Sequence, residues 1–220
     1  MSWISMNKKV GVLRFLGTNC DQDIWRAIES VNMTPSWLWY QDHFNEQDYD
    51  AFVIPGGFSY GDYLRCGAMA AKMPVMQSLH EASQKGKPIL GICNGFQILC
   101  ESGLLPGALI RNADRHFIDE WVDLELVNPC SYWAGETSAC RIPIAHGEGR
   151  FFATTDQIKE LEDSGQIWWR YKENPNGSLN DIAGIMNKQK NVAALMPHPE
   201  RAMHKWMGSD VGRVFFESVL

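Results

Sequence analysis

Several features that would assign this chain to a particular class of protein are missing from its 220 residues. No apolar run is long enough to span a bilayer, and the first residues lack the apolar stretch of a signal peptide. The six cysteines include no Cys-x-x-Cys pair, and no tract of Lys and Arg marks a nucleic-acid site. We therefore expect a cytoplasmic protein with reduced thiols that binds neither membranes nor nucleic acids.

A Gly-x-x-x-x-Gly-Lys-Ser/Thr loop is also absent, and no carboxylate cluster suggests metal-bound ATP, so we expect no nucleotide cofactor and no metal in this chain. With 45% hydrophobic residues, 21% charged residues and a formal net charge of −6, the composition is typical of a globular protein. We predict a flexible N-terminal tail over residues 1–8 and one domain over residues 9–220, with Met6 as an alternative start.

Short apolar segments alternate with amphipathic ones in the first half of the chain. Expected strands are 9–15, 36–40, 51–54 and 89–92, and expected helices are 21–31, 67–85 with a kink at Pro74, and 94–102. This alternation predicts an α/β fold with a three-layer, doubly wound, mostly parallel sheet and right-handed crossovers. Ligands in such sheets bind beyond the carboxyl ends of the strands.

The pattern changes after Gly107. Strands are expected at 121–127, 139–144, 167–171, 182–186 and 192–195 with no helices between them, and a short helix at 211–219. The C-terminal half is therefore predicted to add antiparallel hairpins to the sheet.

The most informative motif is Gly91-Ile92-Cys93-Asn94-Gly95, at the junction of a predicted strand and helix. A Gly-x-Cys-x-Gly turn there is typical of a nucleophile elbow, in which two glycines allow the sharp turn that exposes the thiol. The helix N-terminus beside Cys93 would favour the thiolate over the thiol. The alternative is that Cys93 is a small buried core residue.

A second motif, Pro197-His198-Pro199-Glu200, stands near the end of the chain. Pro199 disfavours helical backbone at His198, and in an extended chain residues 198 and 200 point to the same side. Glu200 could therefore bind one imidazole nitrogen and leave the other to face a thiol, as in a catalytic triad. The alternatives are a solvated turn and a metal site of His198, Glu200 and His204, although their spacing fits no common metal motif.

Together these motifs resemble those of the class I, triad-type glutamine amidotransferases, which have a flavodoxin-like fold. Three further stretches, 55–68, 143–150 and 171–178, are similar to the members that serve as a separate glutaminase subunit of a purine-biosynthetic synthase. The resemblance extends from about Lys9 to the end of the chain.

The resemblance implies that Cys93 attacks the side-chain amide of glutamine, that His198 transfers protons, and that Glu200 orients His198. Backbone N–H groups of Gly57 and Asn94 would form the oxyanion hole. Other positions of the same motifs would bind the substrate glutamine, namely Gln97, His146 and Gly147; a tight turn is the structural alternative for the last two.

The resemblance also implies partners. Ammonia would pass to a separate large synthetase subunit that uses ATP and Mg to amidate formylglycinamide ribonucleotide, with a small bridging subunit in the same assembly. The alternatives are an amidotransferase subunit of another synthase, a γ-glutamyl hydrolase without an ammonia acceptor, and an inactive scaffold paralogue.

Nine tryptophans are many for this length. Trp37, Trp39 and Trp121 lie in predicted strands, and we expect them in the core. Trp168 and Trp169 are adjacent in another strand, so one of them is predicted to face outward and is our candidate interface residue.

Overall fold

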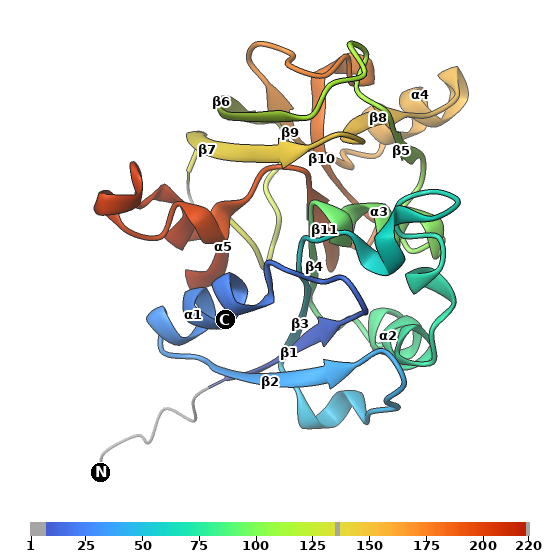
Figure 1. Cartoon of the computed structure of the whole chain (residues 1–220), viewed down its shortest axis with the longest axis vertical. Helices are drawn as coiled ribbons and strands as arrows, with labels where there is room; N and C mark the ends of the chain where they lie inside the picture. Colours follow the sequence, from blue (N-terminus) through green and yellow to red (C-terminus); the bar gives the residue numbers. More distant parts are fainter. Residues whose placement is uncertain (1–7, 135–136, 219–220) are drawn as a thin grey trace.

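The computed structural model describes residues 8–134 and 137–218. Its main feature is a nine-stranded sheet with the strand order β2-β1-β3-β4-β11-β10-β9-β6-β7 (Figure 1). The predicted tail lies outside the described residues, apart from Lys8.

The first half of the sheet is parallel, as the alternating pattern predicts. Its strands are β1 (Lys9–Arg14), β2 (Thr34–Trp39), β3 (Ala51–Ile54), β4 (Ile89–Ile92) and β11 (Val192–Leu195). Its helices are α1 (Asp21–Ser30), α2 (Val75–Gln84) and α3 (Asn94–Glu101). Figure 1 shows α1 on one side of the sheet and α2 and α3 on the other, which makes three layers. The central strands β3, β4 and β11 are therefore buried on both faces, consistent with their uninterrupted apolar sequences.

The second half of the sheet is antiparallel, which confirms the predicted hairpins. Its strands are β6 (Ile118–Leu126), β7 (Ala139–His146), β9 (Ile167–Tyr171) and β10 (Ile182–Met186). A separate two-stranded sheet pairs β5 (Ala108–Ile110) with β8 (Arg150–Phe152). Pairing of β11 with β4 joins the two halves and places this late strand beside the centre of the parallel sheet.

The prediction that no helix separates the C-terminal strands is wrong. Helix α4 (Thr155–Asp163) lies between β8 and β9, and of its residues only Leu161 is buried. Its N-terminus carries a capping box in which Thr154 and Gln157 bond each other's backbone N–H groups. The Thr-x-x-Gln spacing is the signal that could have revealed it.

The predicted 67–85 helix is interrupted where proline requires it. A 3-10 turn (Ala70–Lys72) comes first, and α2 begins at Val75 directly after Pro74. At the C-terminal end, a 3-10 turn (Val211–Arg213) leads into α5 (Val214–Glu217), and residue 219 of the predicted helix lies outside the described residues.

Two predictions about tryptophans are also wrong. Trp168 and Trp169 are both fully buried, and both rings pack near Phe215 of α5, with centroids 5.7 and 5.6 Å away. Both faces of β9 are covered, so neither ring faces outward. Trp39 is 44% exposed because it ends the edge strand β2, where the Arg14 guanidinium stacks on its ring.

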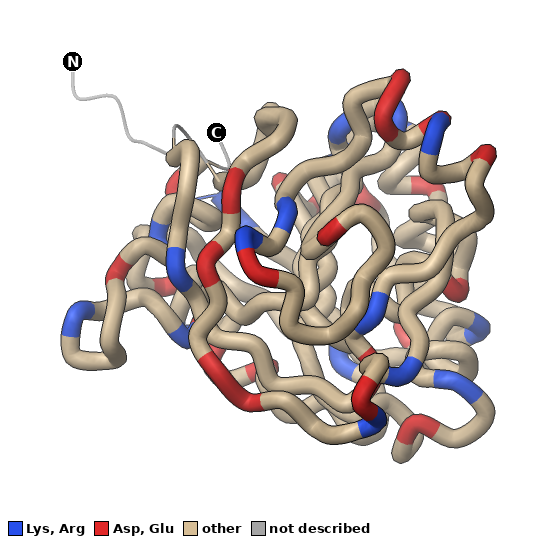
Figure 2. Tube along the Cα trace, turned by 90° about the horizontal axis from the view of Figure 1, so that it is seen from above, with Lys and Arg blue, Asp and Glu red and all other residues tan. Residues whose placement is uncertain are grey.

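Lys and Arg are interspersed with Asp and Glu along the chain trace (Figure 2). Within the described ranges, no helix combines the length and the apolarity needed to cross a bilayer.

Candidate active site

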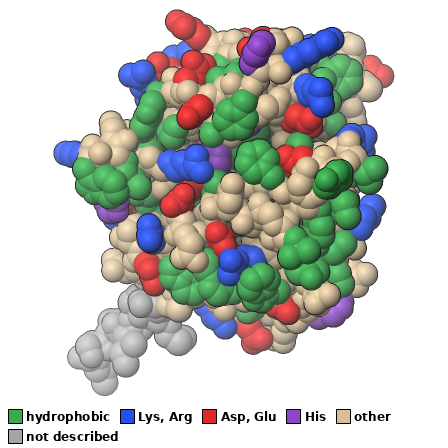
Figure 3. All heavy atoms as spheres, viewed as in Figure 1, with side chains coloured by type: hydrophobic (Ala, Val, Ile, Leu, Met, Phe, Trp, Pro, Cys, Tyr) green, Lys and Arg blue, Asp and Glu red, His purple; other side chains and the backbone are tan. Residues whose placement is uncertain are grey.

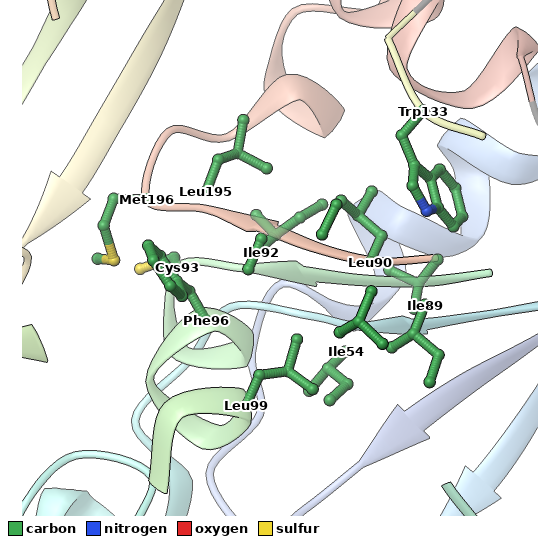
Figure 4. Close-up of a cluster of buried hydrophobic side chains, with 14 of the residues drawn as sticks. Ile54, Ile89, Leu90, Ile92, Cys93, Phe96, Leu99, Trp133, Leu195 and Met196 are labelled. Carbon is green, nitrogen blue, oxygen red and sulfur yellow. The ribbon is translucent and has the colours of Figure 1, made fainter. Parts of the chain in front are cut away.

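The turn between β4 and α3 holds Cys93 in an unusual backbone conformation. Figure 4 shows Cys93 at the end of β4, whose side chains pack in the core beside Ile54, Leu99 and Leu195. Cys93 has φ 52° and ψ −106°, a combination that non-glycine residues adopt only where the surroundings enforce it. The neighbouring Gly95 has no room for a side chain, because a Cβ there would lie 2.1 Å from the Ile54 carbonyl oxygen. Close packing of α3 on β3 therefore enforces the elbow.

Pairing of β4 with β11 brings the second motif to the same edge of the sheet. Ile92 pairs with Leu195, and the Cys93 N–H donates to the Leu195 carbonyl oxygen at 2.9 Å. Three residues beyond Leu195, the His198 N–H donates to the Pro143 carbonyl oxygen at 2.8 Å. Residues 93 and 198 thus lie together, although about a hundred positions separate them in the sequence.

His198 and Glu200 form a fully buried pair, with Nδ1 2.6 Å from Oε1. The backbone differs from the expected extended chain, because Pro199–Arg201 form one turn of 3-10 helix that curls Glu200 back to the ring. Burial lowers the pKa of His198, but the charges of Glu200 and Cys93 outweigh it and hold that pKa well above its usual value. The raised pKa favours the protonated form of the His198 imidazole.

Gly56 is the point where the reactive side chains meet. A Cβ on Gly56 would lie 2.8 Å from His198 Cε1, 3.0 Å from Cys20 Sγ and 3.4 Å from Cys93 Cβ. The absent side chain is therefore what lets histidine and nucleophile approach each other.

Cys20 is a neighbour of the site that sequence reasoning missed. Its Sγ accepts a hydrogen bond from Arg201 Nη2 at 3.1 Å. Its position just before α1, at the carboxyl edge of the parallel sheet, is the signal that could have placed it there.

A cavity of about 310 Å³ opens over these groups. Of the predicted site residues, it is lined by Cys93, His198, Gly57, Gln97, His146 and Gly147. Glu200 and Asn94 do not line it; Glu200 bonds His198, and Asn94 is buried in the first turn of α3. The volume is at the lower end of the range typical of small-molecule pockets, about 300–1,000 Å³.

The backbone N–H groups of Gly57 and Asn94 are the predicted donors of an oxyanion hole. In the described part of the chain, the N–H groups of Gly57 and Asn94 have no hydrogen-bond acceptor. Gly57 is packed closely, because a Cβ on it would lie 2.7 Å from the Gly17 carbonyl oxygen. Free N–H groups beside a nucleophile can stabilise negative charge on a substrate oxygen.

The Gln97 side chain is already used within the protein. Its Oε1 accepts from Asn94 Nδ2 at 2.8 Å, and its Nε2 donates to the Glu148 carbonyl oxygen at 2.6 Å. Gln97 therefore ties the loop after β7 to α3 while lining the cavity.

His146 is buried and neutral. Its Nδ1 lies 3.1 Å from Asn112 Oδ1, which also accepts from the Gly149 N–H, while Asn112 Nδ2 donates to two carbonyl oxygens. Since Asn112 Oδ1 can only accept, the proton of His146 is on Nδ1, and Nε2 is a bare acceptor. Burial, followed by the His198 charge, lowers the pKa of His146 to about 4. The bare Nε2 of His146 can accept a hydrogen bond from an N–H group of a ligand, but it cannot donate one to a ligand carboxylate.

One group in the described ranges combines three potential metal ligands, Cys20, His198 and Glu200, with ligand atoms within 4.8 Å of one another. His204, which the metal alternative included, is outside this group and stacks on Trp206. Because Glu200 already bonds His198 and the Arg201 guanidinium contacts Cys20, the geometry favours a histidine–carboxylate pair over a metal ion.

Comparison with known proteins shows the family to which the chain belongs. A family model described as a CobB/CobQ-like glutamine amidotransferase domain matches residues 7–216. The chain is 51% identical over 217 residues to phosphoribosylformylglycinamidine synthase subunit PurQ from Trichormus variabilis, covering 96% of each chain. It is 48% identical to the PurQ subunit from Chlorobaculum tepidum, covering 96% of this chain and 95% of that one.

A solved structure gives the same result. A chain in the structure of PurLQS from Thermotoga maritima superimposes with a TM-score of 0.89 at 42% identity, covering 97% of this chain and 98% of that one. The chain therefore belongs to the CobB/CobQ-like glutamine amidotransferase family, in the group of PurQ subunits of phosphoribosylformylglycinamidine synthase.

Proposed function

We propose that this chain is the glutaminase of a phosphoribosylformylglycinamidine synthase, and that it hydrolyses glutamine through a thioester on Cys93. The observation that carries the proposal is the meeting of the Cys93 elbow with the buried His198–Glu200 pair at one cavity. The near full-length similarity to PurQ subunits supports this synthase over any other.

In the first half of the reaction, the Cys93 sulfur attacks the side-chain carbonyl carbon of glutamine. The electron pair of the C=O bond moves to oxygen, where the N–H groups of Gly57 and Asn94 stabilise it. His198 donates its proton to the amide nitrogen, so the C–N bond breaks and ammonia leaves. Glu200 keeps the imidazole ring oriented through Nδ1.

In the second half, His198 takes a proton from water, and the hydroxide attacks the thioester. The carbon–sulfur bond breaks, Cys93 recovers its electron pair, and glutamate leaves. The proton stays on His198, ready for the next cycle. The balance is glutamine and water to glutamate and ammonia.

The ammonia is consumed on another chain in this proposal. A large synthetase subunit would use ATP and Mg to convert formylglycinamide ribonucleotide to formylglycinamidine ribonucleotide, and a small subunit would bridge the two. The similarity to a chain of the PurLQS structure supports such an assembly. All six cysteines are free, which suits the cytoplasmic location that we propose.

Partner binding would also complete the site. The loop after Gly57 exposes Phe58, Tyr63 and Leu64, at 47%, 74% and 88%. Apolar side chains gather over this segment on the right of the space-filling view (Figure 3). We expect weak glutaminase activity alone and a higher rate when a synthetase covers this loop and orders the Gly57 N–H. Equal turnover with and without the partner would refute this.

The test is synthesis of formylglycinamidine ribonucleotide by the reconstituted complex. Cys93→Ser should abolish the reaction with glutamine and leave the reaction with ammonium intact, because the acceptor chemistry is on the synthetase. Cys140→Ser, a buried cysteine in β7 outside the cavity, is the matched control and should keep both. Loss of both reactions in Cys93→Ser would show that this chain also supplies acceptor chemistry.

A diazo-ketone analogue of glutamine separates the remaining alternatives. Labelling of Cys93 would exclude the inactive scaffold, whereas an unlabelled Cys93 would favour it. A γ-glutamyl hydrolase would be labelled too, but it would not support the amidation when the synthetase is added.

A further inference from the structure

Two carboxylates, Asp62 and Glu148, line the cavity that contains Cys93, and neither forms an ion pair with a buried Lys or Arg in the described part of the chain. Asp62 Oδ1 is buried and has no hydrogen-bond partner among the described residues. Glu148 pairs with Arg111 at 3.4 Å, but that arginine side chain is 78% exposed, so the pair is weak.

Cys66 lies between the two carboxylates. Its thiol donates to Glu148 Oε2 at 3.2 Å. Burial, together with its contacts to both carboxylates, raises the pKa of Cys66, so the group stays a neutral thiol. A thiol is a weak donor with one proton, and it leaves most acceptor sites of the two carboxylates unfilled.

The pKa of Asp62 indicates that its carboxylate lacks a neighbouring cation among the described residues. Burial raises its pKa, the contact with the Cys66 thiol lowers it, and the charge of Glu148 raises it again. Two negative groups around one thiol in a half-buried site are unfavourable until a cation joins them.

An independent observation also indicates an N–H donor. His146 is 3% exposed, lines the same cavity, and its Nε2 has no hydrogen-bond partner among the described residues. The ring is neutral with Nε2 as an acceptor. A ligand that fills this part of the cavity would therefore be expected to donate an N–H group to Nε2.

We propose that Asp62 and Glu148 form the subsite for the α-ammonium group of the substrate glutamine. This rests on the proposed glutaminase function and assigns the orientation of the substrate. The carboxamide carbon lies at Cys93 and the amino-acid end points to the acidic wall. Gln97 positions that wall, because its Nε2 holds the Glu148 carbonyl oxygen at 2.6 Å.

The test compares two substrates of the complete synthase, L-glutamine and 4-carbamoylbutanoate, which is glutamine without its amino group. The readout is kcat/KM for L-glutamine divided by kcat/KM for 4-carbamoylbutanoate. Loss of folding or of Cys93 reactivity would lower both values and leave this ratio unchanged. Asp62→Asn and Glu148→Gln should each reduce the ratio by about 10- to 100-fold, the effect expected for losing one charge-assisted hydrogen bond. Glu173→Gln, an exposed carboxylate with no ion pair in the described ranges, is the matched control and should keep the wild-type ratio.

The outcomes separate the subsite from the function on which it rests. A wild-type complex that turns over glutamine, with an unchanged ratio in both variants, would overturn the subsite alone. Weaker binding of the synthetase by the variants, with that same unchanged ratio, would assign the carboxylates to a cation of the partner instead. A wild-type complex that releases no glutamate, with Cys93 unlabelled by the diazo-ketone, would overturn both proposals.

Discussion

The backbone N–H of Ser59 donates to Asn94 Oδ1 at 3.2 Å, which ties the loop after β3 to the first turn of α3. These two segments carry the free N–H groups of Gly57 and Asn94. One side chain therefore sets the distance between the two proposed oxyanion donors.

Asn94→Ala should lower kcat for glutamine by about 10- to 100-fold, because the donors are no longer held at a fixed separation. It should also cost about 1–3 kcal/mol in the free energy of unfolding, since buried bonds to Ser59 and Gln97 are lost. Steady-state kinetics and urea unfolding measure the two effects.

Asn191→Ala is the matched control for Asn94→Ala. Asn191 is equally buried, but it bonds the carbonyl oxygens of Ser83 and Lys87 at the far end of β4. The Asn191→Ala variant should lose a similar amount of unfolding free energy and keep the wild-type kcat. A comparable fall in kcat in both variants would mean that general loosening, and not the oxyanion donors, is responsible.

Gly56→Ala should reduce glutaminase activity by about 100-fold, because a Cβ 2.8 Å from His198 Cε1 must displace the ring. Gly86→Ala is the control: its φ of 78° also disfavours a side chain, at about 1 kcal/mol, but nothing lies within 4 Å of the new Cβ. Both variants should unfold at a lower urea concentration than the wild type, and only Gly56→Ala should lose activity. Full activity in Gly56→Ala would show that the imidazole position is not critical.

Glu200→Gln should impair catalysis less than Cys93→Ala or His198→Ala, because Glu200 acts through His198. A larger loss in Glu200→Gln than in His198→Ala would reverse the assigned roles. Kinetics of the three variants with glutamine in the complete synthase measure this order.

The same substitution should weaken the pH dependence of stability. In the wild type, the raised pKa of His198 means that the folded protein binds the proton more tightly than the unfolded chain. This stabilisation is complete below the unfolded pKa of about 6.5 and is lost as the pH rises through the folded pKa, at up to about 1.4 kcal/mol per pH unit. In Glu200→Gln the largest contribution that raises the pKa of His198 is removed, while burial still lowers that pKa and Cys93 still raises it, so the decline above about pH 6.5 should be smaller. Urea unfolding from about pH 6 to about pH 9 checks this, and parallel curves for the two proteins would contradict it.

His146 should produce a stability change at lower pH. Its folded pKa of about 4 lies below the value of about 6.5 for an unfolded histidine, so acid protonates the unfolded chain first. Stability is full above about pH 6.5 and falls by about 3 kcal/mol as the pH drops to about 4. His146→Gln should remove this acid sensitivity, and His80→Gln, on α2, should keep it. Equal acid sensitivity in both variants would place the effect elsewhere.

Local sequence was sufficient to predict the parts of the fold that repeat a simple pattern. The uninterrupted apolar runs of β3, β4 and β11 and the Gly-x-Cys-x-Gly turn predict buried strands and an elbow, because strand and turn preferences act over a few residues. The same local logic failed for α4, where the capping box was visible but the helix has few apolar residues. It failed again for Trp168 and Trp169, because burial of both faces of β9 depends on α5, which is distant in sequence.

The candidate site shows the same division. Cys93, His198 and Glu200 stand in recognisable motifs, whereas Cys20, Asp62 and the acceptor on His146 gain meaning only from neighbours far along the chain. Even the Glu200 contact was predicted through an extended backbone, and the structure achieves it through a 3-10 turn. Side-chain types indicate which chemistry is possible, but packing decides which atoms meet.

Because β4 and β11 are adjacent and in register, one hydrogen-bonded ladder sets the spacing between nucleophile and base. The roughly hundred residues between them include β6, β7, β9 and β10, which extend the same sheet, before the chain returns to pair β11 with β4. Lengthening or trimming the surface loops of this segment would reshape what enters the cavity without disturbing the reacting pair. Such an arrangement allows loop changes to adapt the same catalytic pair to different partner enzymes.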